Sequence, residues 1–398
     1  MVQLSRSNIL HFIPALGGDC ILIEFDNKEC ILIDSGYKST YEQELKPLLL
    51  KLSKSGYKIK LFIVTHIDSD HLSGAIQLLE ENGEYNNPQI IEINNIWYNG
   101  FFSTLFSNNV FEHHKVNTIS KNQNKKMKVI QGQLEMQINK EEPLISAKQS
   151  KCFELLCANL GYPINHQFQR QIVRRKQNDS EMLNDNIVNL GDFVITVLSP
   201  NDFLIDKLAH EFNIELIKMF GKNYKINKNS TFWDLYEKLM ILKMEEPTKT
   251  NTLIGTESEE IESWLGTSTM APMNYVNQAS IVVQIEYKDI KMLFTGDSDS
   301  DLWGKYLDSY YDIIKISHHG TLKPNVSIIQ ETKGNHVLVS TNGKKYGHPE
   351  KDLIANLALG DFKKLHFNYD LDIKDTLIKN QDKYNYEAIF KCKKIYLD

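Results

Sequence analysis

The chain has few cysteines, no long apolar run and no excess of positive charge. Its five cysteines are odd in number and scattered, and none forms a Cys-x-x-Cys pair, which favours a reduced, cytoplasmic protein over a disulfide-linked secreted one. No stretch reaches the ~18 consecutive apolar residues that a membrane-spanning helix requires. The first residues also lack the apolar region and small-residue cleavage site of a signal peptide. We therefore expect a cytoplasmic protein that does not enter a membrane.

The charge balance argues against one broad class of partner. Fifty-one acidic and 45 basic residues give a net charge of −6 at pH 7. A globally basic nucleic-acid-binding protein is therefore not expected, although a local basic cleft stays open. With 41% hydrophobic residues in 398, the chain has the composition of a soluble globular protein and the length for one elaborated domain or two.

Apolar patterning alternates between strand and helix along much of the chain. Leucines at 45, 48, 49 and 52 lie on one helical face, and a second such face runs from 72 to 79. This alternation predicts a layered α/β core. Short apolar runs bounded by turn residues predict strands at 9–13, 20–25, 30–33, 61–64, 193–198, 280–287, 291–295, 312–316 and 335–340. Further helices are predicted at 203–220, at 232–244 and after Pro349.

The stretch 60–74, KLFIVTHIDSDHLSG, carries the densest set of reactive side chains. Its apolar start predicts a buried strand, and His66, Asp68, Asp70 and His71 follow within six residues. Two imidazoles and two carboxylates this close together are costly to bury without partners. In a loop after a buried strand they converge on one point, as the ligands of a metal ion do. The sequence therefore predicts a metal centre here.

Three later strands end in residues of the same chemical kind. Asp297 follows the strand at 291–295 after a glycine turn, and His318 and His319 follow the strand at 312–316. His348 lies in a loop beyond the strand at 335–340. Ligands gather beyond strand ends in sheet-based folds, so four such ends in one chain strengthen the prediction of a shared metal site.

In this order the motifs resemble those of metallo-β-lactamase-fold hydrolases, with the soluble hydrolase domain of the ComEC-type DNA-uptake family as the nearest match. The resemblance implies an α/β four-layer αββα sandwich forming a single domain over residues 1–398. Two insertions interrupt it, one irregular or helical at 101–190 and one helical at 203–275. The matching motifs are Leu16–Cys20, Leu32–Gly36, Thr65–Gly74, Asn277–Ser280, Thr295–Asp297, His318–Gly320 and Tyr346–Pro349.

The resemblance also implies two adjacent metal positions that share one carboxylate. One of His318 and His319 would join the second position, and we favour His318 because it leaves the strand first. Asp34 would lie behind the ligands and orient them. The other implied ligands are His66 and Asp68 for the first position, Asp70 and His71 for the second, and Asp297 for the bridge.

Two departures from the family pattern bear on the metal. Asp68 stands where most of the superfamily has histidine, and residues 277–280, where a third histidine usually falls, read NQAS. The first position is therefore rich in oxygen ligands and short of nitrogen ligands. Carboxylates and water suit harder ions. We expect one or two divalent ions (Mn²⁺, Zn²⁺ or Mg²⁺), with Mn²⁺ or Mg²⁺ favoured over Zn²⁺ at the first position.

The predicted chemistry is hydrolysis of a phosphodiester, with DNA or RNA as candidate substrates. A divalent ion lowers the pKa of a bound water toward ~7 and generates hydroxide, and two ions about 4 Å apart can hold the phosphate oxygens. The candidate catalytic residues are Asp70, in the metal loop, and His348. His348 lies outside the metal cluster, where it would donate a proton to the leaving group or bind a phosphate oxygen.

Two other functions stay open. The first is hydrolysis of a small molecule such as a cyclic nucleotide or a phosphorylated headgroup, with the insertions as a lid over a small pocket. The second is a binding module with a structural metal, which predicts a closed coordination sphere, and the absent third histidine argues against it. The sequence does not determine the substrate, the resident metal, the number of ions or the oligomeric state.

Several segments carry both a functional and an ordinary interpretation. Aromatic residues at 97, 98, 101 and 102 would either stack bases in a cleft or pack in the core. Basic runs at 121–128 and 170–176 would either follow a nucleic-acid backbone or form a solvated surface. The adjacent histidines at 113 and 114 would either bind metal or lie in a surface loop. We favour the ordinary interpretation of each.

Overall fold

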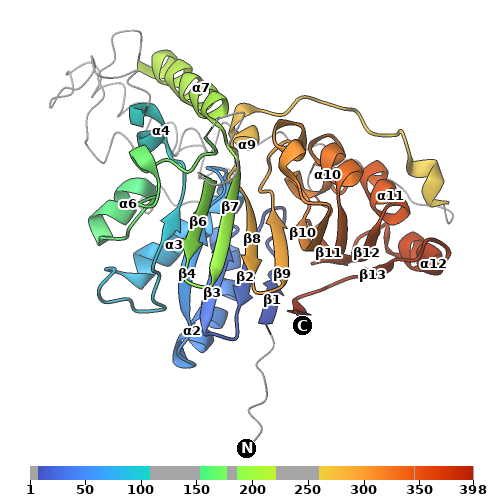
Figure 1. Cartoon of the computed structure of the whole chain (residues 1–398), viewed down its shortest axis with the longest axis horizontal. Helices are drawn as coiled ribbons and strands as arrows, with labels where there is room; N and C mark the ends of the chain where they lie inside the picture. The colour runs from blue at the N-terminus through green and yellow to red at the C-terminus, as the bar shows by residue number, and fades with distance from the viewer. Residues whose placement is uncertain (1–7, 108–152, 177–185, 221–259, 345, 398) are drawn as a thin grey trace, which may run out of the picture.

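The computed structural model describes residues 8–107, 153–176, 186–220, 260–344 and 346–397. Two mixed β-sheets lie at its centre, with helices on their outer sides (Figure 1). The six-stranded sheet contains β1 (Asn8–Phe12), β2 (Ile21–Glu24), β3 (Glu29–Ile33), β4 (Lys58–Ile63), β5 (Ile96–Trp97) and β14 (Lys394–Leu397), in the order β14-β1-β2-β3-β4-β5. The eight-stranded sheet contains β6 (Ile187–Leu190), β7 (Phe193–Ser199), β8 (Val282–Tyr287), β9 (Ile290–Phe294), β10 (Tyr310–Lys315), β11 (Lys333–Val339), β12 (Phe362–Phe367) and β13 (Glu387–Ile389), in reverse chain order.

The strands are apolar on both faces because both faces are covered. In β3, Ile31 and Ile33 pack in the core between the two sheets, whereas Cys30 and Leu32 pack in the core beneath the helices of the first sheet. A third core lies between the second sheet and its own helices. Three apolar layers separate four layers of structure, so the four-layer αββα sandwich is confirmed.

The helices cover the outer faces of the two sheets (Figure 1). The longest one outside the first sheet, α7, packs on α4, where the ring centroids of Phe101 and Phe212 lie 4.2 Å apart. None of the described helices is both long and apolar enough to cross a bilayer. The helices are α1 (Lys38–Thr40), α2 (Lys46–Lys54), α3 (Ser69–Asn82), α4 (Phe101–Ser107), α6 (Phe153–Leu160), α7 (Asp202–Phe220), α9 (Tyr275–Gln278), α10 (Val326–Glu331), α11 (Lys351–Leu359) and α12 (Lys374–Tyr384). Short helical turns lie at Tyr41–Leu45, Gln169–Gln171, Ile261–Trp264, Ser300–Leu302, Gly304–Tyr306, His318–Gly320 and Lys323–Asn325.

Most of the predicted elements are present with shifts of a few residues. The predicted helical face at 72–79 belongs to α3, and the predicted strand at 61–64 is the end of β4. Within the expected insertion at 101–190, Ile187–Leu190 is strand β6 and pairs with β7. The helix predicted at 232–244 lies outside the described residues.

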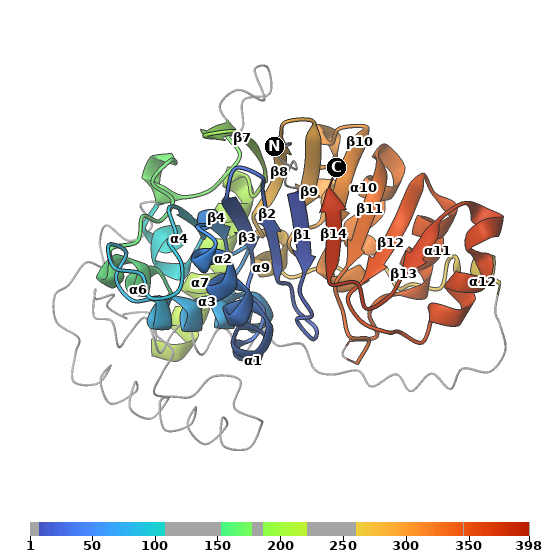
Figure 2. The same ribbon diagram turned by 90° about the horizontal axis from the view of Figure 1, so that it is seen from below.

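The end of the chain returns to its beginning. Strand β14 pairs with β1 in antiparallel register, with Ile9 opposite Tyr396, so the two strands lie side by side (Figure 2). The residues after 360, which carried no prediction, also supply β12, β13 and α12. The C-terminal segment therefore completes both sheets.

Half-buried His336 on β11 and buried His366 on β12 form a pair that makes the fold sensitive to acid. Nδ1 of His336 lies 2.9 Å from Nε2 of His366, whose Nδ1 lies 3.3 Å from Sγ of Cys392. Burial, with a contribution from Lys364, lowers the pKa of His336 to about 4. Burial, with contributions from His336 and Lys364, lowers the pKa of His366 to about 3. Both imidazoles are therefore neutral in the folded protein at pH 5.

We expect acid to destabilise the protein through this pair. An unfolded histidine takes up a proton near pH ~6.5, whereas the folded pair does not, so the free energy of unfolding falls as the pH drops below ~6.5. For His366 the loss at pH 5 is about 2 kcal/mol. Urea unfolding at pH 7.5 and 5 should show a smaller loss in a His336→Gln, His366→Gln variant than in the wild type. Equal losses in the two proteins would contradict the prediction.

Candidate metal centre

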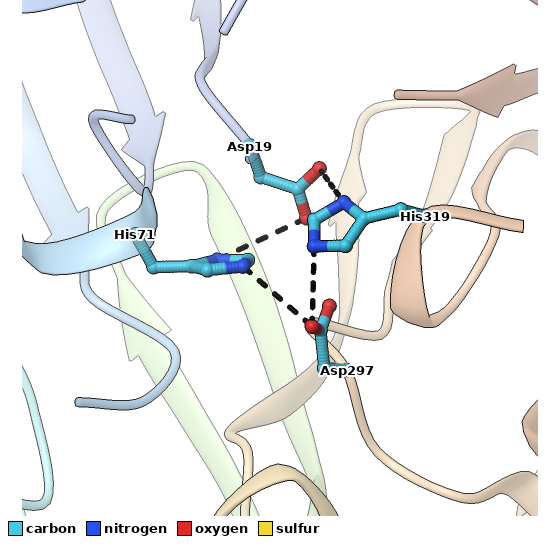
Figure 3. Close-up of side chains that lie close together, drawn as sticks. All are labelled: Asp19, His71, Asp297 and His319. Carbon is cyan, nitrogen blue, oxygen red and sulfur yellow. Dashed lines mark ion pairs between the residues drawn. The ribbon is translucent and has the colours of Figure 1, made fainter. Parts of the chain in front are cut away.

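The candidate site lies where the carboxyl ends of four strands meet. Parallel pairs β3–β4 and β9–β10 direct their following loops to the same edge of the sandwich. The loop after β4 leads into α3, whose first turn carries Asp70 and His71. The loops after β9 and β10 carry Asp297 and His319, and Figure 3 shows His71, Asp297 and His319 turned toward one another.

Two glycines allow the backbones around the site to approach closely. A Cβ atom on Gly18 would lie 2.1 Å from the backbone oxygen of Asp70. A Cβ atom on Gly74 would lie 2.3 Å from the backbone oxygen of Ser35. Either side chain would clash with main-chain atoms, so only glycine permits the first turn of α3 to lie against the loops after β1 and β3.

The carboxylate of Asp297 lies at the centre of the cluster. Its Oδ2 lies 3.3 Å from Nε2 of His319, 3.7 Å from Nε2 of His71 and 3.9 Å from Nε2 of His66. All four side chains are almost fully buried, with at most 4% of the side-chain surface exposed. One carboxylate oxygen is therefore faced by the same nitrogen of three imidazole rings.

Two further carboxylates lie on either side of this centre. Oδ2 of Asp68 lies 3.5 Å from Nε2 of His66. Asp70 places Oδ1 3.9 Å from Nε2 of His71 and Oδ2 3.5 Å from Nε2 of His319. The cluster divides into two groups that share Asp297, one with His66 and Asp68 and the other with Asp70, His71 and His319.

The unpaired polar atoms of this cluster fit a metal ion. Nε2 of His66, Nε2 of His71, Oδ1 of Asp68 and Oδ1 of Asp297 are buried and have no hydrogen-bond partner among the residues that the structure describes. Each buried polar atom left in this state costs about 1–3 kcal/mol. Imidazole nitrogens and carboxylate oxygens are ligands of divalent cations, so a bound ion would satisfy all four atoms at once. The mixed nitrogen and oxygen set does not select one metal.

The rings are fixed so that Nε2 faces inward. His71 places Nδ1 2.8 Å from Oδ2 of Asp34. The Asp34 carboxylate is itself fixed by Thr65, whose backbone N–H donates to Oδ1 at 2.7 Å and whose hydroxyl donates to Oδ2 at 2.8 Å. His319 donates from Nδ1 to the backbone oxygen of Ser340 at 3.1 Å. Donation from Nδ1 leaves the lone pair on Nε2 for the cluster, so Asp34 and Ser340 set the tautomers that metal binding needs.

The electrostatics of the cluster are those of a site for a cation. Burial alone would lower the pKa of His71, but the charges of Asp34, Asp297 and Asp70 hold it well above its usual value. Burial alone would raise the pKa of Asp297, but His319 and His71 hold it well below its usual value. Burial raises the pKa of Asp70. The carboxylates therefore hold positive charge on the imidazoles, and a divalent ion would take over that role.

Asp19, which no sequence pattern marked as a site residue, lies behind the rings. Together with His71, Asp297 and His319 it offers ligand atoms that lie within 4.8 Å of one another. Its nearest ring atoms are Nδ1 of His319, at 3.6 Å, and Nδ1 of His71, at 4.0 Å (Figure 3). These nitrogens already bond Ser340 and Asp34. Asp19 therefore lies at the Nδ1 edges of the two rings, and its buried Oδ1, which has no hydrogen-bond partner among the described residues, makes it a further candidate ligand.

The partner of Asp19 is a buried lysine. Nζ of Lys315 contacts Oδ2 of Asp19, donates to the backbone oxygen of Gly296 at 2.9 Å and lies 3.6 Å from Oδ1 of Asp297. The side chains of Lys315 and Asp19 are each 2% exposed. Although burial opposes it, the charges of Asp19 and Asp297 raise the pKa of Lys315. A protonated lysine therefore compensates the buried negative charge of Asp19.

His319, not the favoured His318, belongs to the cluster. The two residues have positive φ angles of 49° and 54°, so the chain turns sharply and their rings diverge. His318 lies outside, with Nδ1 3.2 Å from the hydroxyl of Thr321 and its ring centroid 5.4 Å from that of His348. Burial and the positive charges of His318 and His319 hold the pKa of His348 well below its usual value. His348 is therefore a neutral imidazole next to the cluster.

The other sequence candidates lie away from this site. Trp97, Tyr98 and Phe101 are fully buried in the apolar cores, as the ordinary interpretation predicts. Arg175 is buried and donates to the backbone oxygen of Leu198, so the run at 170–176 is not a simple basic surface. The run at 121–128 and the histidines at 113 and 114 lie outside the described residues.

One family model and several solved structures match the chain. Residues 13–85 match the family model described as the Metallo-beta-lactamase superfamily, and no curated protein matches the chain in sequence. Among solved structures, the chain is similar to the metallo-beta-lactamase fold protein YhfI from Bacillus subtilis, with 9% identity, a TM-score of 0.35, and 99% of this chain and 100% of that chain covered. It is also similar to Zn²⁺-bound PqqB from Methylobacterium extorquens, with 10% identity, a TM-score of 0.38, and 98% of this chain and 100% of that chain covered. For CmlA, a diiron β-hydroxylase from Streptomyces venezuelae, the identity is 10% and the TM-score 0.32, with 98% of this chain and 54% of that chain covered.

Proposed function

We propose that this chain, whose residues 13–85 match the metallo-beta-lactamase superfamily model and which has a buried cluster of aspartates and histidines, is a metal-dependent phosphodiesterase. The observation that carries the proposal is the central position of Asp297, whose Oδ2 faces Nε2 of three histidines. A carboxylate shared by two ligand groups suits two adjacent ions, and paired ions suit the displacement at phosphorus in a phosphodiester. The proposed substrate is a phosphodiester of a nucleic acid or a nucleotide.

Each group of residues has a task in this proposal. His66, Asp68 and Asp297 would hold one ion, and Asp70, His71 and His319 would hold the other together with Asp297. A divalent ion bound there would supply Lewis-acid chemistry and lower the pKa of a water. His348, outside both groups, would bind a phosphate oxygen or pass a proton to the leaving oxygen.

The proposed choice of metal rests on the number of oxygen ligands in the site. Three carboxylates and three imidazoles make a harder ligand set than a site of histidines and cysteines, which favours Mn²⁺ or Mg²⁺ alongside Zn²⁺.

The closer relationship to the soluble hydrolase domain of the ComEC-type family is also a proposal. It is supported by the motifs at 295–297, 318–320 and 346–349.

The test is hydrolysis by metal-stripped protein resupplied with Mn²⁺, Mg²⁺ or Zn²⁺. The substrates are bis(p-nitrophenyl) phosphate, single-stranded DNA and RNA. We expect turnover that requires metal and falls by at least about 10³-fold in an Asp70→Ala, His71→Ala variant, which loses ligands of one ion. A matched control changes the exposed Asp289 and His210 to alanine and should keep full activity. Stoichiometric metal binding without turnover on any of the three substrates would refute the phosphodiesterase.

A further inference from the structure

A cavity of about 410 Å³ opens next to the metal centre. Its walls come from the segment before and within α9, the turn after β10 and the loop after β11, at residues 269–277, 318–324 and 346–350. It adjoins the cluster because His348, which lines it, has its ring centroid 6.4 Å from that of His319. The volume is at the lower end of the range of small-molecule sites.

Two residues that line the cavity each have a buried polar atom without a hydrogen-bond partner in the described part of the chain. The two atoms are Nδ1 of His348, a residue that is 8% exposed, and Oδ1 of Asn277, a residue that is 4% exposed. Burying such atoms unpaired is unfavourable, and a ligand that supplies the missing hydrogen bonds would remove that cost. Asn277 and His348 are therefore the lining residues best suited to bond a polar ligand.

The backbone of the wall is also held in an unfavourable conformation. His318 and Tyr346, both lining residues, have φ angles of 49° and 61°, in the left-handed region that residues with a Cβ atom rarely adopt. Strain of this kind persists where the surrounding structure fixes a functional geometry. Here it places two rings along one cavity, at centroid distances of 5.4 Å and 5.8 Å from the ring of His348.

The described residues that line the cavity offer no uncompensated cation to a ligand. Lys323 is paired with Asp299 at 3.1 Å and also with Asp301, so its charge is compensated. The carboxylate of Glu350 accepts a hydrogen bond from the backbone N–H of Leu322 at 2.8 Å. A phosphate backbone binds where several uncompensated cations lie together. One compensated lysine and one carboxylate do not form such a binding site. The cavity suits an uncharged group.

We propose that this cavity binds one planar, uncharged, hydrogen-bonding ring that the substrate carries on one side of its scissile phosphodiester. The three aromatic rings of the wall stack against it, and Asn277 and His348 bond its polar edge. In the reaction, water adds its oxygen to phosphorus and one proton to the leaving oxygen as the P–O bond breaks. The proposal rests on the proposed phosphodiesterase and names the substrate as an ester of a ring-bearing alcohol such as a nucleoside.

The test compares two phosphate esters, one that carries a nucleoside with its planar base and one that carries only a methyl group. Isothermal titration calorimetry measures the binding of thymidine 5′-monophosphate and of methyl phosphate to the Mn²⁺-loaded protein. We expect the dissociation constant of thymidine 5′-monophosphate to be at least about 10-fold lower, since ring stacking and hydrogen bonds add to the shared phosphate contact. Equal affinities would overturn the proposal. Because binding needs no turnover, this outcome is distinct from failure to hydrolyse bis(p-nitrophenyl) phosphate, which would refute the phosphodiesterase itself.

Two variants test whether the ring of the ligand binds in this cavity. Tyr346→Ala removes a ring of the wall, and Thr269→Trp adds a bulky side chain at the exposed rim. Each should reduce the difference between the two ligands to less than about 3-fold, chiefly by weakening thymidine 5′-monophosphate. Tyr310→Ala, which removes an exposed tyrosine on β10, is the matched control and should keep the full difference. A full difference in both cavity variants would place the ring elsewhere and overturn the proposal.

Discussion

Replacing Asp297 with asparagine is expected to lower kcat/KM for bis(p-nitrophenyl) phosphate by at least about 10³-fold and to remove bound metal. The amide keeps the shape of the side chain but loses the negative charge that faces three imidazoles. His66, His71 and His319 all have Nε2 within 3.9 Å of Oδ2 of this carboxylate, so both ligand groups lose their shared member. Elemental analysis of the purified variant, beside the activity assay, measures the metal directly.

A matched variant separates this effect from a general loss of negative charge. Asp289→Asn makes the same chemical change in the exposed turn between β8 and β9, and it should leave metal content and rate unchanged. Circular dichroism would show whether Asp297→Asn still folds. A folded Asp297→Asn protein that retains its metal and its rate would contradict the bridging role of this carboxylate.

The first half of the metal centre could be predicted because its residues are close in sequence. A buried strand, a short loop and the first turn of α3 carry His66, Asp68, Asp70 and His71, so local geometry brings them together. Asp297 was found in the same way, from its place after a strand and a glycine turn. Placement of polar residues beyond strand ends is readable without knowing how the sheets pack.

The choice between His318 and His319 could not be made from the sequence, because it depends on backbone angles. Order along the chain favoured His318. The structure has positive φ angles at both residues, followed by Gly320 at 101°, and this turn places His319 in the cluster and His318 in the cavity wall. Positive φ at two successive residues with side chains is set by packing around the turn and leaves no sequence pattern.

Asp19 and Lys315 were missed because each has an ordinary local context. Asp19 follows two glycines and has the sequence of a turn, and Lys315 interrupts an apolar strand. Their pairing joins residues almost 300 positions apart, and nothing in either segment shows it. The signal that was present is the lysine itself, since a charged residue within a strand that is buried on both faces requires a partner.

The C-terminal strand β14 was missed for a related reason. Its short KIYL pattern does not indicate a strand by itself, because the evidence for the strand is its pairing with β1.

The pair of Lys315 and Asp19 leads to the largest expected effect on stability. Lys315→Met keeps most of the volume of the side chain and removes its charge, which leaves the carboxylate of Asp19 buried without its cation. Removing one partner of a buried ion pair typically costs about 3–5 kcal/mol, because the remaining charge has lost both water and its counter-ion. Urea unfolding in the presence of a chelator, which keeps metal binding from contributing, measures this loss.

The double variant Asp19→Asn, Lys315→Met tests the physical cause. Removing both charges leaves no uncompensated carboxylate at position 19, so we expect the double variant to recover at least about 1–2 kcal/mol relative to Lys315→Met alone. If the double variant lost the sum of the two single losses, the two residues would act independently. Lys315 would then stabilise the protein chiefly through its bond to the backbone of Gly296 and its contact with Asp297, and Asp19 would not be the reason that the site contains a buried lysine.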